Sequence, residues 1–151
     1  MKYRKVTDNE NIISFKKLDT RTFKLLQPID NEAVVIMTRK LAKNAGFQLT
    51  DEVMIATAAS ELATNILRYA QQGEITVTII QINDTHQTGI EIYAQDQGPG
   101  IRDLQMAMKD NYSTSKMSLG MGLPSVERIM DEFEIESELG HGTRVLTRKW
   151  C

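Results

Sequence analysis

Hydrophobic and polar positions divide the chain into helical and extended segments. Apolar residues at positions 34, 37 and 41 recur at helical spacing, which predicts a helix over about 31–45 that Asp30 caps and Gly46 ends. The polar residues 50–52 open a second predicted helix that runs to about residue 70. Its core-facing stripe is predicted to be Ile55, Ala59, Leu62, Ile66 and Tyr69.

Alternating apolar residues predict two hairpins. One joins strands over 74–82 and 90–96, and the other joins 134–138 to 143–147. Pro124 is typical of the first position of a helix, here predicted over about 124–133, and residues 11–28 suggest one or two further strands. This order of elements predicts an α+β fold, a two-layer sandwich whose mixed, mostly antiparallel sheet carries the helices on one face.

Composition and charge narrow the class of protein. The chain has 151 residues, of which 41% are hydrophobic, so it can bury a core of its own as one domain. A net charge of −2 provides no basic field for nucleic acid or an anionic membrane, and no apolar run is long enough to span a bilayer. We therefore expect a cytoplasmic protein whose partners are proteins and small molecules.

Metal-ligand spacing is also missing from the sequence. The cysteine, Cys151, and the two histidines, His86 and His141, lie far apart along the chain. A metal ion would have to arrive with a ligand or bind oxygen atoms.

Glu61 and Asn65 stand one turn apart on the second predicted helix, at the margin of its apolar stripe. An Asn amide oxygen can be one ligand of a hydrated Mg²⁺ that carries nucleotide phosphates, and a Glu carboxylate can accept a proton from a hydroxyl. Taken alone, such a pair is more often solvated surface.

Three glycine-rich turns lie downstream of that helix. The run Asp96-Gln-Gly-Pro-Gly100 ends a predicted strand, Gly120-Met-Gly122 precedes a helix, and Gly140-His-Gly142-Thr143 turns the last hairpin. Each turn by itself indicates only a loop. Their order after Glu61 and Asn65 is a more specific pattern. It lacks the Gly-Lys-Ser/Thr ending of a Walker P-loop.

Four short motifs carry a resemblance over residues 28 to 150: Ser60-Glu-Leu-Ala-Thr-Asn-Ile66, Asp96-Gln-Gly-Pro-Gly-Ile101, Gly120-Met-Gly-Leu-Pro124 and Met130-Asp-Glu-Phe133. In this order they resemble the ATP-binding domain, the Bergerat fold, that histidine kinases share with gyrase, heat-shock chaperones and mismatch-repair ATPases. Within that superfamily the chain is similar to the short serine/threonine kinases of bacterial anti-sigma regulation, among them the switch-protein kinase of the stressosome. The resemblance implies a kinase domain over 28–151, with 1–27 as an extension or edge strands.

The resemblance also implies ATP and Mg²⁺ as cofactors and assigns roles to residues. Asp96 would accept a hydrogen bond from the adenine amino group, Thr143 would add a hydroxyl near the base, Asn65 would hold Mg²⁺, and Glu61 would be the catalytic base. The remaining implied cofactor-binding residues shape the pocket wall (Gly98 and Gly100) or open the segment that faces the phosphates (Gly120, Gly122 and Leu123).

Two classes of function remain open at this stage. In the first, the protein phosphorylates Ser or Thr on small anti-sigma-antagonist (STAS) domains or stressosome scaffold proteins. In the second, it is a binding module that holds a sigma factor or activates a phosphatase, with little kinase activity. Arg39, Lys40 and Lys43 form a candidate docking surface. Ser118 departs from the family pattern, because a lid glycine is usual at that position.

Overall fold

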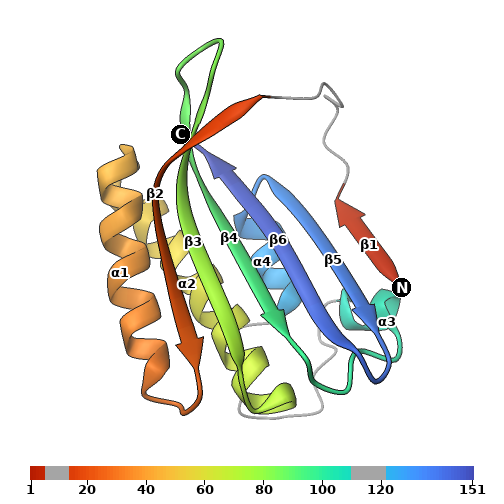
Figure 1. The fold of residues 1–151 in the computed structure, drawn as a ribbon. Coiled ribbons are helices and arrows are strands. Elements are labelled where there is room, and N and C mark those ends of the chain that lie inside the picture. The colour runs from red at the N-terminus through yellow and green to blue at the C-terminus, as the bar shows by residue number, and fades with distance from the viewer. Residues whose placement is uncertain (6–13, 110–121) are drawn as a thin grey trace.

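The structure is a computed structural model that describes residues 1–5, 14–109 and 122–151 (Figure 1). Its six strands form one sheet in the order β1-β5-β6-β4-β3-β2. The strands are β1 (Lys2–Lys5), β2 (Phe15–Leu25), β3 (Gly73–Ile82), β4 (Thr88–Asp96), β5 (Glu132–Glu138) and β6 (Gly142–Trp150). Every strand pairing that the structure describes is antiparallel, so the prediction of a mixed sheet is corrected. The reason is that β3–β4 and β5–β6 are hairpins, and these two hairpins pair antiparallel through β4 and β6.

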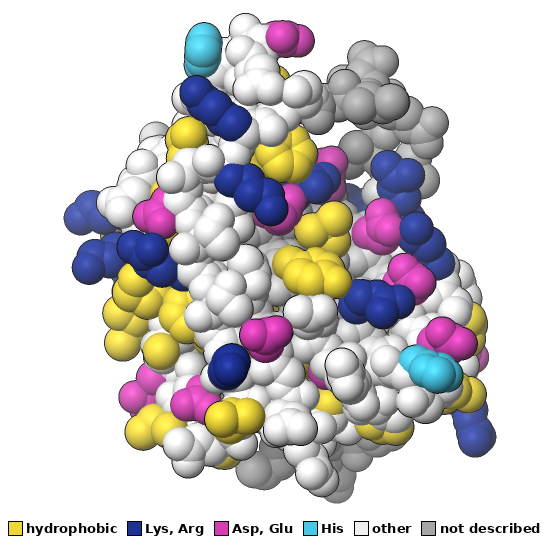
Figure 2. All heavy atoms as spheres, viewed as in Figure 1, with side chains coloured by type: hydrophobic (Ala, Val, Ile, Leu, Met, Phe, Trp, Pro, Cys, Tyr) yellow, Lys and Arg dark blue, Asp and Glu magenta, His cyan; other side chains and the backbone are white. Residues whose placement is uncertain are grey.

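The helices cover one face of this sheet, which confirms the predicted two-layer α+β fold (Figure 1). They are α1 (Asp30–Ala45), α2 (Leu49–Asn65), α3 (Leu104–Ala107) and α4 (Leu123–Ile129). The apolar core fills the space between the helices and the sheet. The opposite face of the sheet carries mainly polar and charged side chains, with a few apolar ones near its centre (Figure 2).

The ends of α1 show one confirmed prediction and one correction. Gly46 ends the helix in the left-handed conformation, with φ of +105°, as the sequence predicts. Asp30 does not cap the helix, because it is itself the first helical residue. Its carboxylate instead accepts hydrogen bonds from the backbone N–H groups of Leu26 (2.8 Å) and Gln27 (3.0 Å), which fixes the loop before α1.

A five-residue π-helical turn, Ile66–Ala70, follows α2 directly. The predicted stripe is buried up to Ile66, but Tyr69 is 53% exposed, so its assignment to the core is wrong. A π turn bonds each residue to the fifth one along the chain, which rotates the following side chains away from an α-helical stripe. Tyr69 therefore leaves the core.

Helix α4 is shorter than predicted. It ends at Ile129, and Phe133, the predicted last helical residue, lies in β5, where it pairs with Thr147. Met130 already has extended backbone angles, with φ of −92° and ψ of 151°. Both Met130 and Phe133 are buried, so their apolar spacing suits the core whether the backbone is helical or extended.

Both edge strands of the sheet come from the first 25 residues. β1 pairs with β5 at one edge, and β2 pairs with β3 at the other. A domain boundary at residue 28 stays a prediction. No helix in the described ranges 1–5, 14–109 and 122–151 is long and apolar enough to cross a membrane.

Candidate functional site

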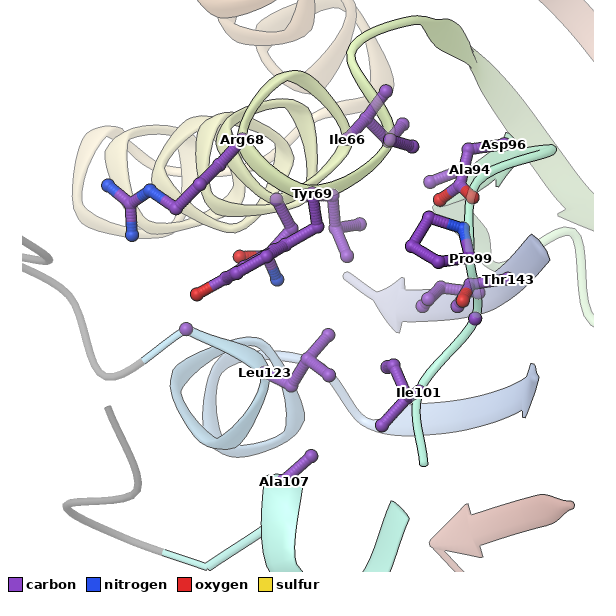
Figure 3. A pocket seen from close by; sticks show the side chains of 16 residues that line it. Ile66, Arg68, Tyr69, Ala94, Asp96, Pro99, Ile101, Ala107, Leu123 and Thr143 are labelled. Atoms are coloured by element: carbon purple, nitrogen blue, oxygen red, sulfur yellow. The ribbon is translucent and has the colours of Figure 1, made fainter. Parts of the chain in front are cut away.

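A cavity of about 300 Å³ lies between the end of α2 with its π turn on one side and β4, β6 and α4 on the other (Figure 3). Six of the residues that the sequence assigns to a nucleotide site line it: Asn65, Asp96, Gly100, Gly122, Leu123 and Thr143. Residues that lie as far apart in the sequence as Leu62 and Val145 thus line the same cavity. The predicted residues Gly120 and Ser118 lie outside the described part of the chain.

Asp96 and Thr143 form the polar part of the cavity wall on the side of the sheet. They are directly opposite each other in the β4–β6 register. One Asp96 oxygen, Oδ1, accepts the backbone N–H of Gly98 at 2.9 Å, which leaves Oδ2 available at the cavity. The Thr143 hydroxyl is 2.8 Å from the buried Ser137 hydroxyl, which also accepts the N–H of Ile101 at 2.7 Å. This arrangement presents a fixed acceptor beside a hydroxyl.

Glycines allow the turns around Asp96 to pack closely. A Cβ on Gly98 would lie 2.5 Å from the Cβ of Ala70, so Gly98 lets the β4 turn approach the π turn, although it does not itself line the cavity. Gly100 and Gly142 have φ of +80° and +97°. A Cβ on Gly142 would collide with the backbone carbonyl of Asp96. The last turn therefore holds β6 against the acceptor residue.

Asn65, the final residue of α2, is half-buried and lines the cavity. Within the described residues its side chain has no hydrogen-bond partner, so its amide oxygen can receive a ligand. The same part of the chain holds no cluster of three or more His, Cys, Asp or Glu side chains that could bind a metal. A Mg²⁺ ion at Asn65 would therefore need oxygen ligands from water and phosphate, which suits the preference of this ion.

Glu61 lies one turn before Asn65 on α2, and it does not line the cavity. Burial raises the pKa of its carboxyl group above the ordinary value, and the nearby positive charge of Arg68 partly opposes this effect. A carboxylate with a raised pKa accepts a proton more readily than a carboxylate with the ordinary pKa, which suits a general base.

The π turn contributes four residues to the cavity wall, none of which the sequence interpretation assigned to the site: Ile66, Arg68, Tyr69 and Ala70. The Arg68 guanidinium carbon lies 6.0 Å from the centre of the Tyr69 ring. In Figure 3 the Tyr69 ring extends between the π turn and Leu123. No local signal distinguishes this turn from a continuing α-helix, because Tyr69 fits the α-helical stripe. π turns occur frequently at functional sites.

The cavity fits a flat ligand with a polar edge. Its other walls are mostly apolar, from residues such as Leu62, Ala94, Ile101 and Val145. Gly122 has φ of +59°, and among the described residues other than its chain neighbours no atom lies within 4 Å of the position that its Cβ would take. An adenine ring against the apolar walls, with its amino group at Asp96, matches this chemistry.

Comparison with known proteins agrees with the geometry. The chain belongs to the histidine kinase-like ATPase domain family, whose model matches residues 28–149. It is 42% identical over 132 residues to the serine/threonine-protein kinase RsbT of Bacillus subtilis (strain 168), which covers 87% of this chain and 97% of that protein.

Relatives with lower sequence identity are named anti-sigma F factors rather than kinases. The chain is 37% identical over 100 residues to the anti-sigma F factor of Caldanaerobacter subterraneus subsp. tengcongensis, covering 64% of this chain and 68% of that protein. It is 35% identical over 100 residues to the anti-sigma F factor of Clostridium acetobutylicum, covering 63% and 67%. The predicted resemblance to ATP-binding domains of anti-sigma regulation is confirmed at the level of the family, and membership of this family implies ATP binding.

Proposed function

We propose that this protein is a Mg-ATP-dependent serine/threonine kinase that modifies a small regulatory protein in a bacterial partner-switching pathway. The observation that carries the proposal is the arrangement of Asp96, Thr143 and Asn65 around one cavity, in a chain of the ATPase domain family. The similarity to a serine/threonine-protein kinase over 97% of that protein's length supports phosphotransfer to a hydroxyl group.

Each site residue has a role in this proposal. Asp96 Oδ2 accepts a hydrogen bond from the adenine amino group, and the Thr143 hydroxyl contacts the base beside it. Gly98 and Gly100 keep the β4 turn close to the base. Asn65 supplies one oxygen to the Mg²⁺ that accompanies the phosphates, and Gly122 and Leu123 border the phosphate end. Gly120, outside the described residues, keeps the phosphate-binding role that the resemblance implies. Tyr69 covers the ligand from the π turn.

Glu61 is proposed as the base. The hydroxyl oxygen of the acceptor Ser or Thr attacks the γ-phosphorus of ATP, the bond to the β-phosphate oxygen breaks, and ADP leaves. The hydroxyl proton passes to the Glu61 carboxylate. Glu61 lies outside the cavity, one turn from Asn65, which is where an acceptor hydroxyl on a separate protein could approach.

The test is a phosphotransfer assay with Mg-ATP and STAS-domain or stressosome scaffold proteins from the same organism. Intact mass spectrometry should detect one added phosphoryl group, which fragmentation maps to Ser or Thr. Glu61→Gln should lower the transfer rate about a hundredfold to ten-thousandfold while ATP still binds. Glu32→Gln, an exposed change in the first turn of α1, is the matched control and should transfer normally. An unchanged rate with Glu61→Gln would exclude Glu61 as the base.

A second candidate function is an ATP-responsive binding module that holds a sigma factor or activates a phosphatase. The names of the anti-sigma F factor relatives favour it. The outer surface of α1 is a candidate docking surface, where Lys40 and Lys43 are exposed and Arg39 pairs with Glu52 at 3.0 Å. Capture of a partner with ATP but no phosphoryl transfer, in pull-downs with and without nucleotide, would support this second function.

A further inference from the structure

Strand β1 contacts the two short helices that border the cavity. It lies at the edge of the sheet beside β5, outside the span that the family model matches (Figure 1). Helix α3 packs against β1 and contributes Ala107 to the cavity. Helix α4 begins at Leu123, which forms another part of the cavity wall.

The main link between β1 and α4 is Lys5. Its half-buried ammonium group donates hydrogen bonds to the backbone carbonyls of Glu127 and Met130, both at 3.0 Å. Carbonyls at the end of a helix lack partners within the helix, and a positive charge there is favourable. Lys149 binds the carbonyl of Ile129 at 3.0 Å in the same way. Two lysines from different strands therefore hold the last turn of α4.

Tyr3, on the same strand, packs against the neighbouring strand β5. Its ring packs edge-on against Phe133, with the ring centres 6.2 Å apart. The nearby Glu127 carboxylate, together with burial, raises the pKa of Tyr3 to about 12. Because Tyr3 and Lys5 are two residues apart in a strand, their side chains lie on the same face, toward the helices.

We propose that β1 is a positioning element for the nucleotide site, in which Lys5 holds the end of α4 so that its first residues keep their place in the cavity wall. Helix α4 has only seven residues, so its two ends lie less than two turns apart and move together. This inference rests on the proposed nucleotide-binding function. It assigns a role to the first five residues, for which the resemblance offers none.

The chain offers a matched control on the same strand. Lys2 points to the open face of the sheet, opposite to the helices, where it pairs with Glu134 of β5 at 2.8 Å. Lys5→Met and Lys2→Met therefore remove the same charge from the same strand. Lys5→Arg restores a positively charged hydrogen-bond donor at the α4 end.

The experiment combines calorimetry with hydrogen exchange on the full chain. We expect Lys5→Met to weaken Mg-ATP binding by about three- to tenfold, because two charge-assisted hydrogen bonds to α4 are lost. Lys2→Met should stay within about twofold of the wild type, and Lys5→Arg should recover most of the loss. Backbone amides of residues 126–130 should exchange faster only in Lys5→Met, with β3 and β4 unchanged.

Two outcomes would overturn the inference. Equal loss of affinity in Lys5→Met and Lys2→Met, with faster exchange throughout the protein, would show that β1 contributes only to general stability. Normal affinity and normal α4 exchange in Lys5→Met would show that α4 needs no support from β1. If the wild type binds no Mg-ATP, the proposed function fails separately, and the exchange of α4 still decides whether Lys5 holds this helix.

Discussion

Replacing Asp96 by Asn separates the two tasks of this side chain. In the structure, Oδ1 accepts the Gly98 N–H at 2.9 Å, and Oδ2 remains for a ligand. An Asn side chain can keep the first bond through its amide oxygen, while its NH₂ group replaces the acceptor at the cavity. The β4 turn should therefore stay intact while an adenine amino group loses its partner.

The size of the effect follows from the charge on the acceptor. A hydrogen bond to a charged group contributes about 1.5–3 kcal/mol. At 1.4 kcal/mol for each factor of ten, Asp96→Asn should weaken ATP binding roughly tenfold to a hundred-and-fiftyfold. Asp96→Ala also loses the Gly98 bond, worth about 1 kcal/mol, so its melting temperature should fall by roughly 2–4 °C below that of Asp96→Asn.

Calorimetry with ATP and with the triphosphate of purine riboside, which lacks the amino group, is the decisive assay. The wild type should prefer ATP, and Asp96→Asn should lose this preference, because the deleted group and the deleted acceptor are partners. If Asp96→Asn binds both nucleotides as the wild type does and melts normally, Asp96 does not recognise adenine. The reasoning from its free oxygen would then be refuted.

Three further predictions test other parts of the site. Asn65→Ala should leave ATP binding in EDTA unchanged and reduce the gain in affinity on adding Mg²⁺; equal magnesium titrations would remove Asn65 as a ligand. Because burial raises the pKa of Glu61, its carboxylate becomes protonated at a higher pH than that of an ordinary Glu. The transfer rate should therefore fall as the pH decreases through this raised pKa. The residual rate of Glu61→Gln should lack this decline. A wild-type rate that stays constant down to pH 4.5, the ordinary value, would contradict the role of Glu61. Gly142→Ala should lower the free energy of unfolding by about 2 kcal/mol or more, since φ is +97° and the Cβ meets the Asp96 carbonyl. Gly140→Ala, with φ of +82° but open space at the Cβ position, should lower the free energy of unfolding less. Thermal unfolding of both variants measures the difference.

Much of this protein is determined locally by its sequence. The spacing of apolar residues predicts the two long helices and both hairpins, because helices and strands bury one face with periods of 3.6 and 2 residues. Gly46 ends α1 as predicted, since the left-handed conformation is a local property of glycine. The order of the motifs around Glu61, Asn65 and Asp96 indicates the family, because residues of one site must occur at fixed places in the fold.

Tertiary packing decided the remaining features. Tyr69 left the predicted core because a π turn, which no local pattern marks, rotated it into the cavity wall. Phe133 entered β5 rather than α4, since the same apolar spacing satisfies the core in either backbone conformation. The contact of Lys5 with the end of α4 joins residues more than 120 positions apart. Local sequence limits which backbone conformations each segment can adopt, whereas burial against distant segments selects among them, and that selection shaped the cavity.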